Sequence, residues 1–262
     1  MNNLTYETIV DAGGLFFNYA IRRDQWHRDS ALFTRMLGVC LADESKTSVR
    51  REFYPEYKQH RAWAKKTPKQ QEYAQRAYEL WKETKANQAF TFLQWNGYEA
   101  DDLLAWFGLA GMIVVSLDKD LLQLADQVSI RDMFDNNRWE KHRRMGPESY
   151  KDLPYTANSI LLYLTLYGDA TDNVPRLVPK GAKAIRHFKT LFMLPNPWTH
   201  IEDYIDRAAI IRNLALVVLP HPSLFDISSA DVLQLLKDGE WNTFRKSYVQ
   251  EHIKSTMDYR TI

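Results

Sequence analysis

The sequence predicts an α/β protein built on a mostly parallel twisted sheet with helices on both faces. Short apolar runs alternate along the chain with segments of helical periodicity, which is the pattern of a parallel sheet. Several of these runs end in acidic residues, and no internal repeat or low-complexity tract interrupts the pattern. The length of 262 residues allows a substantial buried core.

The elements of the first half follow from composition and spacing. The expected order is a strand over 6–10, a helix over 15–21, a helix over 31–40, a strand ending near Asp43 and a helix over 67–89. β-branched residues mark the first strand. Gly13 and Gly14 predict a tight turn before the first helix. Pro68 suits the first turn of the long helix.

The second half continues the alternation. We expect a strand over 90–95, a helix over 99–109, a strand over 112–117, a helix opening at 121–125, a strand over 128–133 and a helix over 160–167. The run 112–117 is the clearest buried strand in the sequence. A helical C-terminal portion follows, and no linker divides the chain.

Composition limits what the protein can be. The formal net charge is +1, and Cys40 is the single cysteine, so there is no disulfide framework and no cysteine-based metal site. The N-terminal residues lack the pattern of a signal peptide, and no apolar stretch reaches the roughly 18 residues of a membrane helix. We therefore expect no membrane association and a reducing, cytoplasmic location.

Acidic residues gather at four places where an apolar run meets a turn or a helix start. They are Asp11, the trio Glu99, Asp101 and Asp102, the pair Asp118 and Asp120, and the pair Asp169 and Asp172. Like charges at close range repel, so clustered carboxylates usually serve cations. Oxygen ligands without a Cys or His cluster favour Mg²⁺ or Mn²⁺ over zinc.

The expected architecture brings some of these acids together. In open parallel sheets, ligands bind beyond the carboxyl ends of the strands, where Asp11 and Asp118 both lie. Glu99 opens a helix whose dipole favours negative charge, but capping explains one or two acids there and not three. The last acidic pair, taken alone, also fits a helix end and an Asx turn.

Basic residues flank the acidic clusters. Ten Lys and Arg residues lie between Arg50 and Lys85 against five acids, and residues 176–189 hold five more with no acid. A metal-charged centre beside basic surface suits a polyanionic substrate. Either basic run alone could be a solvated helix face, but together with the acids they predict a metal-dependent phosphodiesterase acting on nucleic acid.

The order and spacing of the motifs resemble the 5′ nuclease family, which includes flap endonucleases, the 5′–3′ exonuclease domain of bacterial DNA polymerase I and stand-alone bacteriophage relatives. The matching stretches are Val10-Asp11, Tyr57-Lys58-Gln59-His60-Arg61, Gly97-Tyr98-Glu99-Ala100-Asp101-Asp102, Asp118-Lys119-Asp120-Leu121 and Gly168-Asp169 through Asp172-Asn173-Val174-Pro175. The resemblance implies one PIN-like 5′ nuclease domain over residues 1–262. It would have a helical arch at about 60–90, a helix-hairpin-helix-like region at about 157–192 and a helical portion at 196–262.

The resemblance also implies two divalent ions about 3.5–4 Å apart, Mg²⁺ with Mn²⁺ as a substitute. The implied metal ligands are Asp11, Asp43, Glu99, Asp101, Asp102, Asp118, Asp120, Asp169 and Asp172. Asp43 is placed by counting back from Tyr57-Lys58, because Leu41-Ala42-Asp43 matches the family pattern more weakly than the other motifs. Asp118 and Asp120 are implied to be essential for cleavage.

Basic residues complete the implied site. Lys58 and Arg61 would stabilise charge on the scissile phosphate. The implied nucleic-acid contacts are Tyr57, Lys58, Arg61, Lys65, Lys66, Lys180, Lys183 and Arg186. Tyr57 fits base stacking and the core equally well. Arg176 and Pro179 stand where the family's hairpin has glycine, which puts its K⁺ site in doubt.

The expected substrate is DNA with a free 5′ end or a 5′ flap, cleaved by a monomer in replication or repair. Other replication proteins are expected as partners, and a phage-encoded protein would act in the host cytoplasm. Three alternatives stay open. They are a primer-removing ribonuclease acting on RNA–DNA hybrids, a non-catalytic structure-specific DNA-binding protein and an Asp-x-Asp phosphatase.

Overall fold

A five-stranded parallel sheet forms the centre of the protein. The computed structural model describes residues 8–21, 40–59, 67–86, 91–131, 157–179 and 190–256. The strands are β1 (Thr8–Asp11), β2 (Cys40–Ala42), β3 (Thr91–Leu93), β4 (Ile113–Val115) and β5 (Ile130–Arg131), in the spatial order β3-β2-β1-β4-β5. β1 is central, and Val10 aligns with Leu41 on one side and Val115 on the other.

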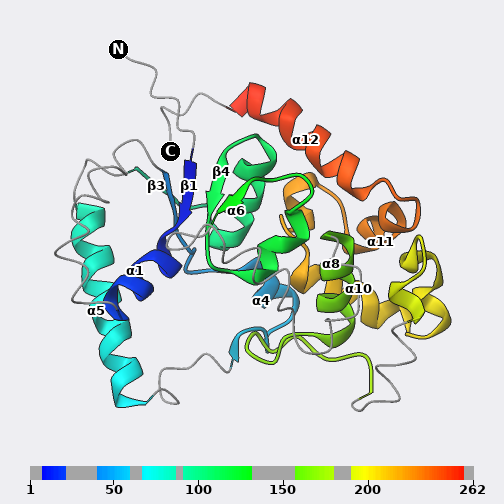
Figure 1. Cartoon of the computed structure of the whole chain (residues 1–262), viewed down its shortest axis with the longest axis horizontal. Helices are drawn as coiled ribbons and strands as arrows, with labels where there is room; N and C mark the ends of the chain where they lie inside the picture. The colour runs from blue at the N-terminus through cyan, green and yellow to red at the C-terminus, as the bar shows by residue number, and fades with distance from the viewer. Residues whose placement is uncertain are drawn as a thin grey trace.

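Helices surround this sheet (Figure 1). They are α1 (Ala12–Ile21), α4 (Val49–Phe53), α5 (Pro68–Ala86), α6 (Ala100–Leu109), α8 (Ala157–Tyr167), α10 (Arg207–Val217), α11 (Ser229–Lys237) and α12 (Trp241–Thr256). The 3₁₀ turns among the described residues are η3 (Lys119–Leu124), η5 (Pro197–Asp203) and η6 (Pro222–Phe225).

The alternation of side chains along the strands creates a core on each face. Ile9 of β1 joins a large cluster that includes α6, α8 and the C-terminal helices. The next residue, Val10, joins a smaller cluster with residues of α1 and α5. Figure 1 shows α1 and α5 side by side on one side of the sheet, opposite α6. The predicted α/β class, with helices on both faces, is confirmed.

The C-terminal helices contribute to the main core. Trp106 of α6 packs against Phe225 with ring centroids 5.7 Å apart, and Phe225 packs against Trp241 of α12 at 5.6 Å. Trp241 is 1% exposed. The helical portion therefore covers α6, the helix that carries the acidic trio. Its place in one domain with the rest of the chain stays a prediction.

Two local expectations were wrong, and three others fall partly outside the described residues. Gly13 and Gly14 lie in the first turn of α1, which begins at Ala12, and do not form a separate turn. A 3₁₀ turn replaces the helix expected at 121–125. Much of the expected helix 31–40, the ends of the arch and the second half of the hairpin region lie outside the described residues.

Candidate active site

Asp11 lies at the carboxyl end of the central strand, as the sequence predicts. The Gly14 N–H donates to its Oδ1 at 2.9 Å, and the Ser116 hydroxyl donates to its Oδ2 at 3.3 Å. A Cβ atom on Gly14 would lie 2.3 Å from Asp11 Oδ2. Gly14 is thus needed for space beside this carboxylate, and not for the turn that the sequence predicted.

The pair Asp118 and Asp120 stands beside Asp11 on η3. The Asp118 N–H donates to Ser116 Oγ at 3.1 Å, so this serine contacts both acidic segments. Asp118 caps η3, with its Oδ1 accepting from the Asp120 N–H at 2.8 Å. A cap and a short 3₁₀ turn fix the two carboxylates more tightly than a longer flexible loop would.

The acidic trio divides into two roles at the start of α6. Both oxygens of Asp102 accept from the Arg50 guanidinium, at 2.6 and 2.8 Å, and its Oδ1 also accepts from the His221 N–H at 2.8 Å. Asp102 is fully buried, and Arg50 holds the pKa of its carboxyl below the usual range although burial opposes this. This is a structural ion pair. Both carboxylate oxygens of Asp102 are thus engaged by Arg50, and its metal-binding role stays a prediction.

Glu99 contacts Tyr57 and Lys58, the motif that follows α4. Its Oε2 accepts from the Tyr57 hydroxyl at 3.1 Å and pairs with Lys58 Nζ at 2.8 Å. Arg50 lies 3.7 Å from the same oxygen. Tyr57 is only 3% exposed, which favours the core alternative, and its base-stacking role stays a prediction. Lys58 points its ammonium group toward the acids.

The last acidic pair lies on the turn after α8. Asp169 Oδ1 accepts from the Thr171 N–H at 2.7 Å, the Asx turn that the sequence favours when this pair is taken alone. Gly168 has a φ of +63°, and a Cβ there would lie 2.3 Å from the Val174 carbonyl oxygen. The Asp172 carboxylate lies 3.9 Å from Lys58 Nζ. The turn is therefore held by its own hydrogen bond, and both of its carboxylates line the pocket.

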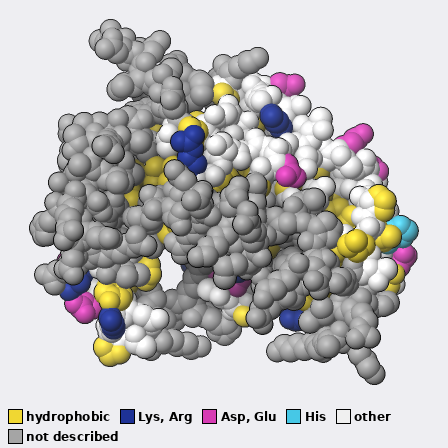
Figure 2. Space-filling view, in the orientation of Figure 1, with side chains coloured by type: hydrophobic (Ala, Val, Ile, Leu, Met, Phe, Trp, Pro, Cys, Tyr) yellow, Lys and Arg dark blue, Asp and Glu magenta, His cyan; other side chains and the backbone are white. Residues whose placement is uncertain are grey.

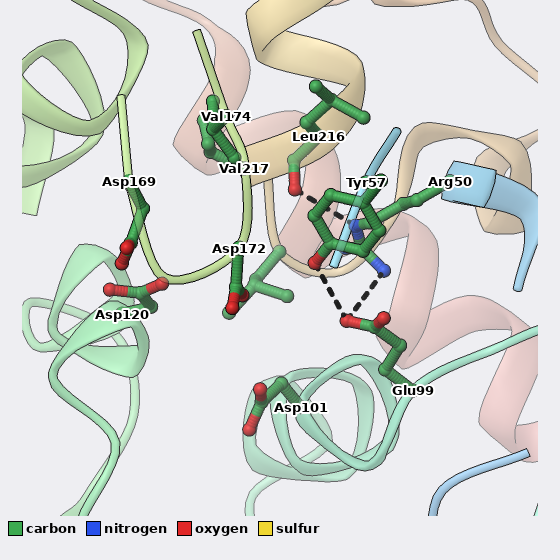
Figure 3. A pocket seen from close by; sticks show the side chains of 11 residues that line it. Arg50, Tyr57, Glu99, Asp101, Asp120, Asp169, Asp172, Val174, Leu216 and Val217 are labelled. Atoms are coloured by element: carbon green, nitrogen blue, oxygen red, sulfur yellow. Dashed lines mark hydrogen bonds and ion pairs between the residues drawn. The ribbon is translucent and has the colours of Figure 1, made fainter. Parts of the chain in front are cut away.

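Five predicted ligands line one pocket. They are Glu99, Asp101, Asp120, Asp169 and Asp172. In Figure 3, Asp120 and Asp169 face each other on one side, Glu99 and Asp101 rise from α6, and Asp172 lies between. The backbone segment 216–219 contributes apolar walls. The fold thus gathers carboxylates from three distant parts of the chain.

Crowding and burial perturb several of these acids. Burial, reinforced by Asp118, raises the pKa of Asp120 to about 8. Burial raises the pKa of Asp11 to about 6, again with a contribution from Asp118. The pKa of Asp101 is raised by burial and by the charges of Asp118 and Asp11. Such shifts mean that the pocket lacks enough positive charge of its own to keep all of its carboxylates ionised.

The donor set fits a hard cation. Glu99 Oε1 and Asp120 Oδ1 are buried without a hydrogen-bond partner, which is costly unless something else binds them. Within the described ranges, no three His, Cys, Asp or Glu side chains converge into a complete ligand set. A bound ion would therefore need some rotation of these side chains or retained water, as Mg²⁺ commonly has.

Asp43 contacts α5 and does not line this pocket. Its Oδ2 accepts from Trp81 Nε1 and pairs with Lys85 Nζ, both at 3.1 Å. Asp43 ends up just after β2, close to where the sequence places a strand end. Its metal-binding role stays a prediction.

These features match known proteins. Residues 30–152 match the family described as the 5′-3′ exonuclease, N-terminal resolvase-like domain. DNA polymerase I of Borreliella burgdorferi is 36% identical over 108 residues, which are 36% of this chain and 11% of that protein. DNA polymerase I of Mycobacterium bovis is 30% identical over 170 residues, which are 58% of this chain and 18% of that protein. Residues 30–152 of this chain are therefore similar to the N-terminal domain of 5′-3′ exonucleases.

Solved structures of the 5′ nuclease family share the fold. The 5′-exonuclease of bacteriophage T5 with bound zinc aligns with a TM-score of 0.56 and 23% identity, covering 89% of this chain and 97% of that one. The T5 D15 flap endonuclease in complex with DNA and metal ions aligns with a TM-score of 0.52 and 22% identity, covering 92% and 98%. By contrast, this chain spans only 11% and 18% of the two polymerases.

Most of the nucleic-acid contacts predicted for this chain lie outside the described residues. Arg61, Lys65, Lys66, Lys180, Lys183 and Arg186 all lie outside the described residues. On the described part of the face in Figure 2, Lys and Arg lie singly among other side chains. The basic surface therefore stays a prediction. None of the helices in the described part is long and apolar enough to cross a membrane.

Arg176, which stands where the family's hairpin has glycine, makes specific contacts with this segment. The Arg176 side chain donates from Nε to the Val178 carbonyl at 2.9 Å and from Nη2 to the Pro179 carbonyl at 3.4 Å. Its guanidinium also lies 4.7 Å from the centre of the Tyr167 ring. A side-chain cation thus contacts hairpin carbonyls directly, which adds to the doubt about a K⁺ site.

Sequence reasoning missed two buried residues that support the site. Arg50 was counted only as part of a basic run, yet it is 1% exposed and anchors Asp102. Gln123 is also 1% exposed and contacts the Asp120 backbone. Its signal was an amide inside the apolar run Leu121-Leu122-Gln123-Leu124. A polar residue in such a run predicts a buried hydrogen-bonding role.

Proposed function

We propose that this protein is a divalent-metal-dependent, structure-specific 5′ nuclease that hydrolyses phosphodiester bonds at 5′ ends or 5′ flaps of DNA. The pocket of five carboxylates carries the proposal, because two of its buried oxygens lack hydrogen-bond partners and the pKa values of Asp101 and Asp120 are raised. A small-substrate phosphatase would leave most of these acids without a purpose.

The residues of the pocket take distinct roles in this proposal. Glu99, Asp101, Asp118 and Asp120 would hold the tighter Mg²⁺ or Mn²⁺ ion, and Asp169 and Asp172 would support the second, partly through water. The metal would supply an activated water and stabilise the leaving oxygen. Lys58 presents its ammonium group 2.8 Å from Glu99, where it adds positive charge for the scissile phosphate. Arg50 and Asp102 keep the start of α6 in place.

DNA is the substrate to test first. The T5 D15 flap endonuclease, whose fold this chain shares, was solved in complex with DNA and metal ions. The relatives in sequence are DNA polymerases, which act on DNA. An RNA–DNA hybrid is included as a competing substrate, because a primer-removing ribonuclease would need the same metal chemistry.

The test is Mg²⁺-dependent cleavage of a 5′-labelled flap duplex. Controls are 3′-flap, blunt, single-stranded and RNA–DNA hybrid substrates, and each protein is also assayed in EDTA. We expect cleavage near the 5′ junction, lost in an Asp118→Asn/Asp120→Asn double variant that still binds the flap. Asp238→Asn removes an exposed carboxylate at the C-cap of α11, outside the pocket, and should leave cleavage unchanged.

Two outcomes would contradict the proposal. Retained cleavage by the double variant would remove these acids from the mechanism. Flap binding without cleavage in either Mg²⁺ or Mn²⁺ would favour a non-catalytic DNA-binding protein. Faster cleavage of the hybrid than of the flap would instead change the substrate and keep the class of enzyme.

A further inference from the structure

Gln123 is a buried amide within the apolar run Leu121–Leu124. It lies on η3 between Leu122 and Leu124, both of which are buried, and is itself 1% exposed. Its Nε2 donates to the Asp120 carbonyl at 3.0 Å and to the Val217 carbonyl at 2.9 Å. Its Oε1 accepts from the Leu219 N–H at 3.0 Å. A buried amide with three good hydrogen bonds is a strong local constraint.

These contacts hold Asp120 through its main chain. The Asp120 N–H donates to Asp118 Oδ1, and the Asp120 carbonyl accepts from Gln123. By contrast, Asp120 Oδ1 has no hydrogen-bond partner. The direction of the carboxylate is therefore set by the backbone on either side of it. Because a 3₁₀ turn has weak internal hydrogen bonds, side-chain contacts of this kind decide where it sits.

The Gln123 side chain and backbone also connect the C-terminal helical portion to the pocket. Val217 and Leu219 belong to the segment that lines the pocket opposite η3, and Gln123 joins that segment to η3. Arg245 of α12 reinforces the junction, with Nη2 donating to the Gln123 carbonyl at 3.0 Å and Nη1 to the Leu219 carbonyl at 3.1 Å.

We propose that Gln123 is a positioning residue for Asp120, which transmits the packing of the C-terminal helices to the metal-binding carboxylates. This inference rests on the proposed function, since it assumes that Asp120 binds a divalent ion. Residues that orient metal ligands typically contribute about 10–100-fold to metal affinity. A merely structural amide would change stability and leave metal affinity unaltered.

Gln127 provides the matched control. It also joins this region to α12, with Nε2 donating to the Asn242 carbonyl at 2.7 Å and Oε1 accepting from Arg245 Nε at 2.7 Å. It does not line the pocket, and neither of these contacts involves Asp120. Gln123→Met and Gln127→Met each replace an amide by an apolar side chain of similar length, so both should lose stability.

The experiment is calorimetric titration of the full chain with Mn²⁺, at a temperature where each variant is folded by circular dichroism. We expect the Mn²⁺ concentration at half-saturation to rise about 10-fold in Gln123→Met and to stay unchanged in Gln127→Met. Should Gln123→Met fail to fold, Gln123→Asn keeps an amide that is one methylene too short to span both carbonyls. It should show the same rise.

The outcomes separate the inference from the proposed function. Wild-type affinity in the folded Gln123 variant, with a stability loss like that of Gln127→Met, would overturn the positioning role alone. Absence of Mn²⁺ binding by wild-type protein that also fails to cleave flap DNA would overturn both. Flap cleavage by the variants at saturating Mn²⁺ should recover, because a positioning defect is overcome by excess ion.

Discussion

The Lys58 backbone N–H donates a 2.7 Å hydrogen bond to the carbonyl oxygen of Asp172. This bond joins the turn after α4 to the turn after α8, although 114 residues separate them in the sequence. Lys58 has a φ of 55°, an uncommon conformation for a residue with a side chain. The main-chain contact and the side-chain approach of Lys58 to Asp172 therefore occur together, and the lysine is placed by the acidic turn that it faces.

Asn173→Ala should loosen this junction. Asn173 has a φ of 59°, and its side-chain amide donates to the Glu56 carbonyl at 2.8 Å. Alanine loses the hydrogen bond and fits the left-handed region poorly, at a cost of about 1–3 kcal/mol in the free energy of unfolding. Asn173→Gly loses only the hydrogen bond, so urea unfolding should place it between wild type and Asn173→Ala. Unchanged kcat in both variants would mean that Lys58 is held without Asn173.

Gly14→Ala should weaken metal binding, whereas Gly13→Ala should not. An added Cβ at Gly14 meets Asp11 Oδ2 at 2.3 Å, but at Gly13 it lies 3.5 Å from Asp11 Oδ1, an ordinary contact. Both glycines lie in the first turn of α1, where alanine is otherwise the better residue by about 0.5–1 kcal/mol. Mn²⁺ titration and thermal melting measure both effects. Equal metal affinity in the two variants would contradict the space requirement at Gly14.

The metal-free protein should lose stability as the pH rises from about 6.5 to 8. Burial raises the pKa of Asp120 from its ordinary value of 3.8 to about 8. In this window the folded protein keeps a proton that the unfolded chain has released, so a rise in pH favours unfolding. Burial lowers the pKa of His221 from 6.5 to about 4. This shift makes stability rise with pH, but only below about pH 6.5, and therefore outside the window considered for Asp120.

Thermal melts in EDTA across this pH range test the expectation. Added Mg²⁺ should flatten the slope, because the ion binds the ionised carboxylates. A melting temperature that rises with pH in EDTA would count against the raised pKa of Asp120.

Asp120→Asn and Asp102→Asn should shift stability in opposite directions. In EDTA at pH 8, Asp120→Asn removes a buried charge that has too little compensation and should raise the free energy of unfolding. Asp102→Asn breaks the buried pair with Arg50 and should lower it by about 3–5 kcal/mol. Denaturant unfolding measures both. Destabilisation by both substitutions would mean that Asp120 has a stabilising partner of its own.

Periodicity predicted most of the fold because each strand alternates between two apolar cores. Ile9 and Val10 belong to different clusters, and Cys40 and Leu41 of β2 divide between the clusters in the same way. The errors are local. Ala12 begins α1 directly after β1, so the two glycines that follow serve the Asp11 carboxylate and not chain reversal. Spacing alone does not distinguish a glycine needed for space from one needed for its backbone angles.

The candidate site was predicted less completely than the fold. Motif order pointed to the acids that line the pocket, but residue type alone does not reveal which carboxylate already has a partner. Asp102 matches its family motif as well as Asp101 does, yet only Asp102 pairs with Arg50. Tyr57 fitted both base stacking and the core, and its burial against Glu99 favours the core. Gln123 supports the site through hydrogen bonds to residues that lie 94 and 96 positions further along the sequence. No local sequence pattern encodes such contacts.

The contact of Arg50 with Leu216 and Val218 has a consequence for biosynthesis. Arg50 donates to these two carbonyls across 166 and 168 residues of sequence. A nascent chain therefore carries every predicted ligand, from Asp11 to Asp172, before the segment that completes their pocket has left the ribosome. At roughly 5–20 residues per second, this delay lasts a few seconds. Nuclease competence would then arrive late in translation, and a chain released early would carry the acids without the enclosure that organises them.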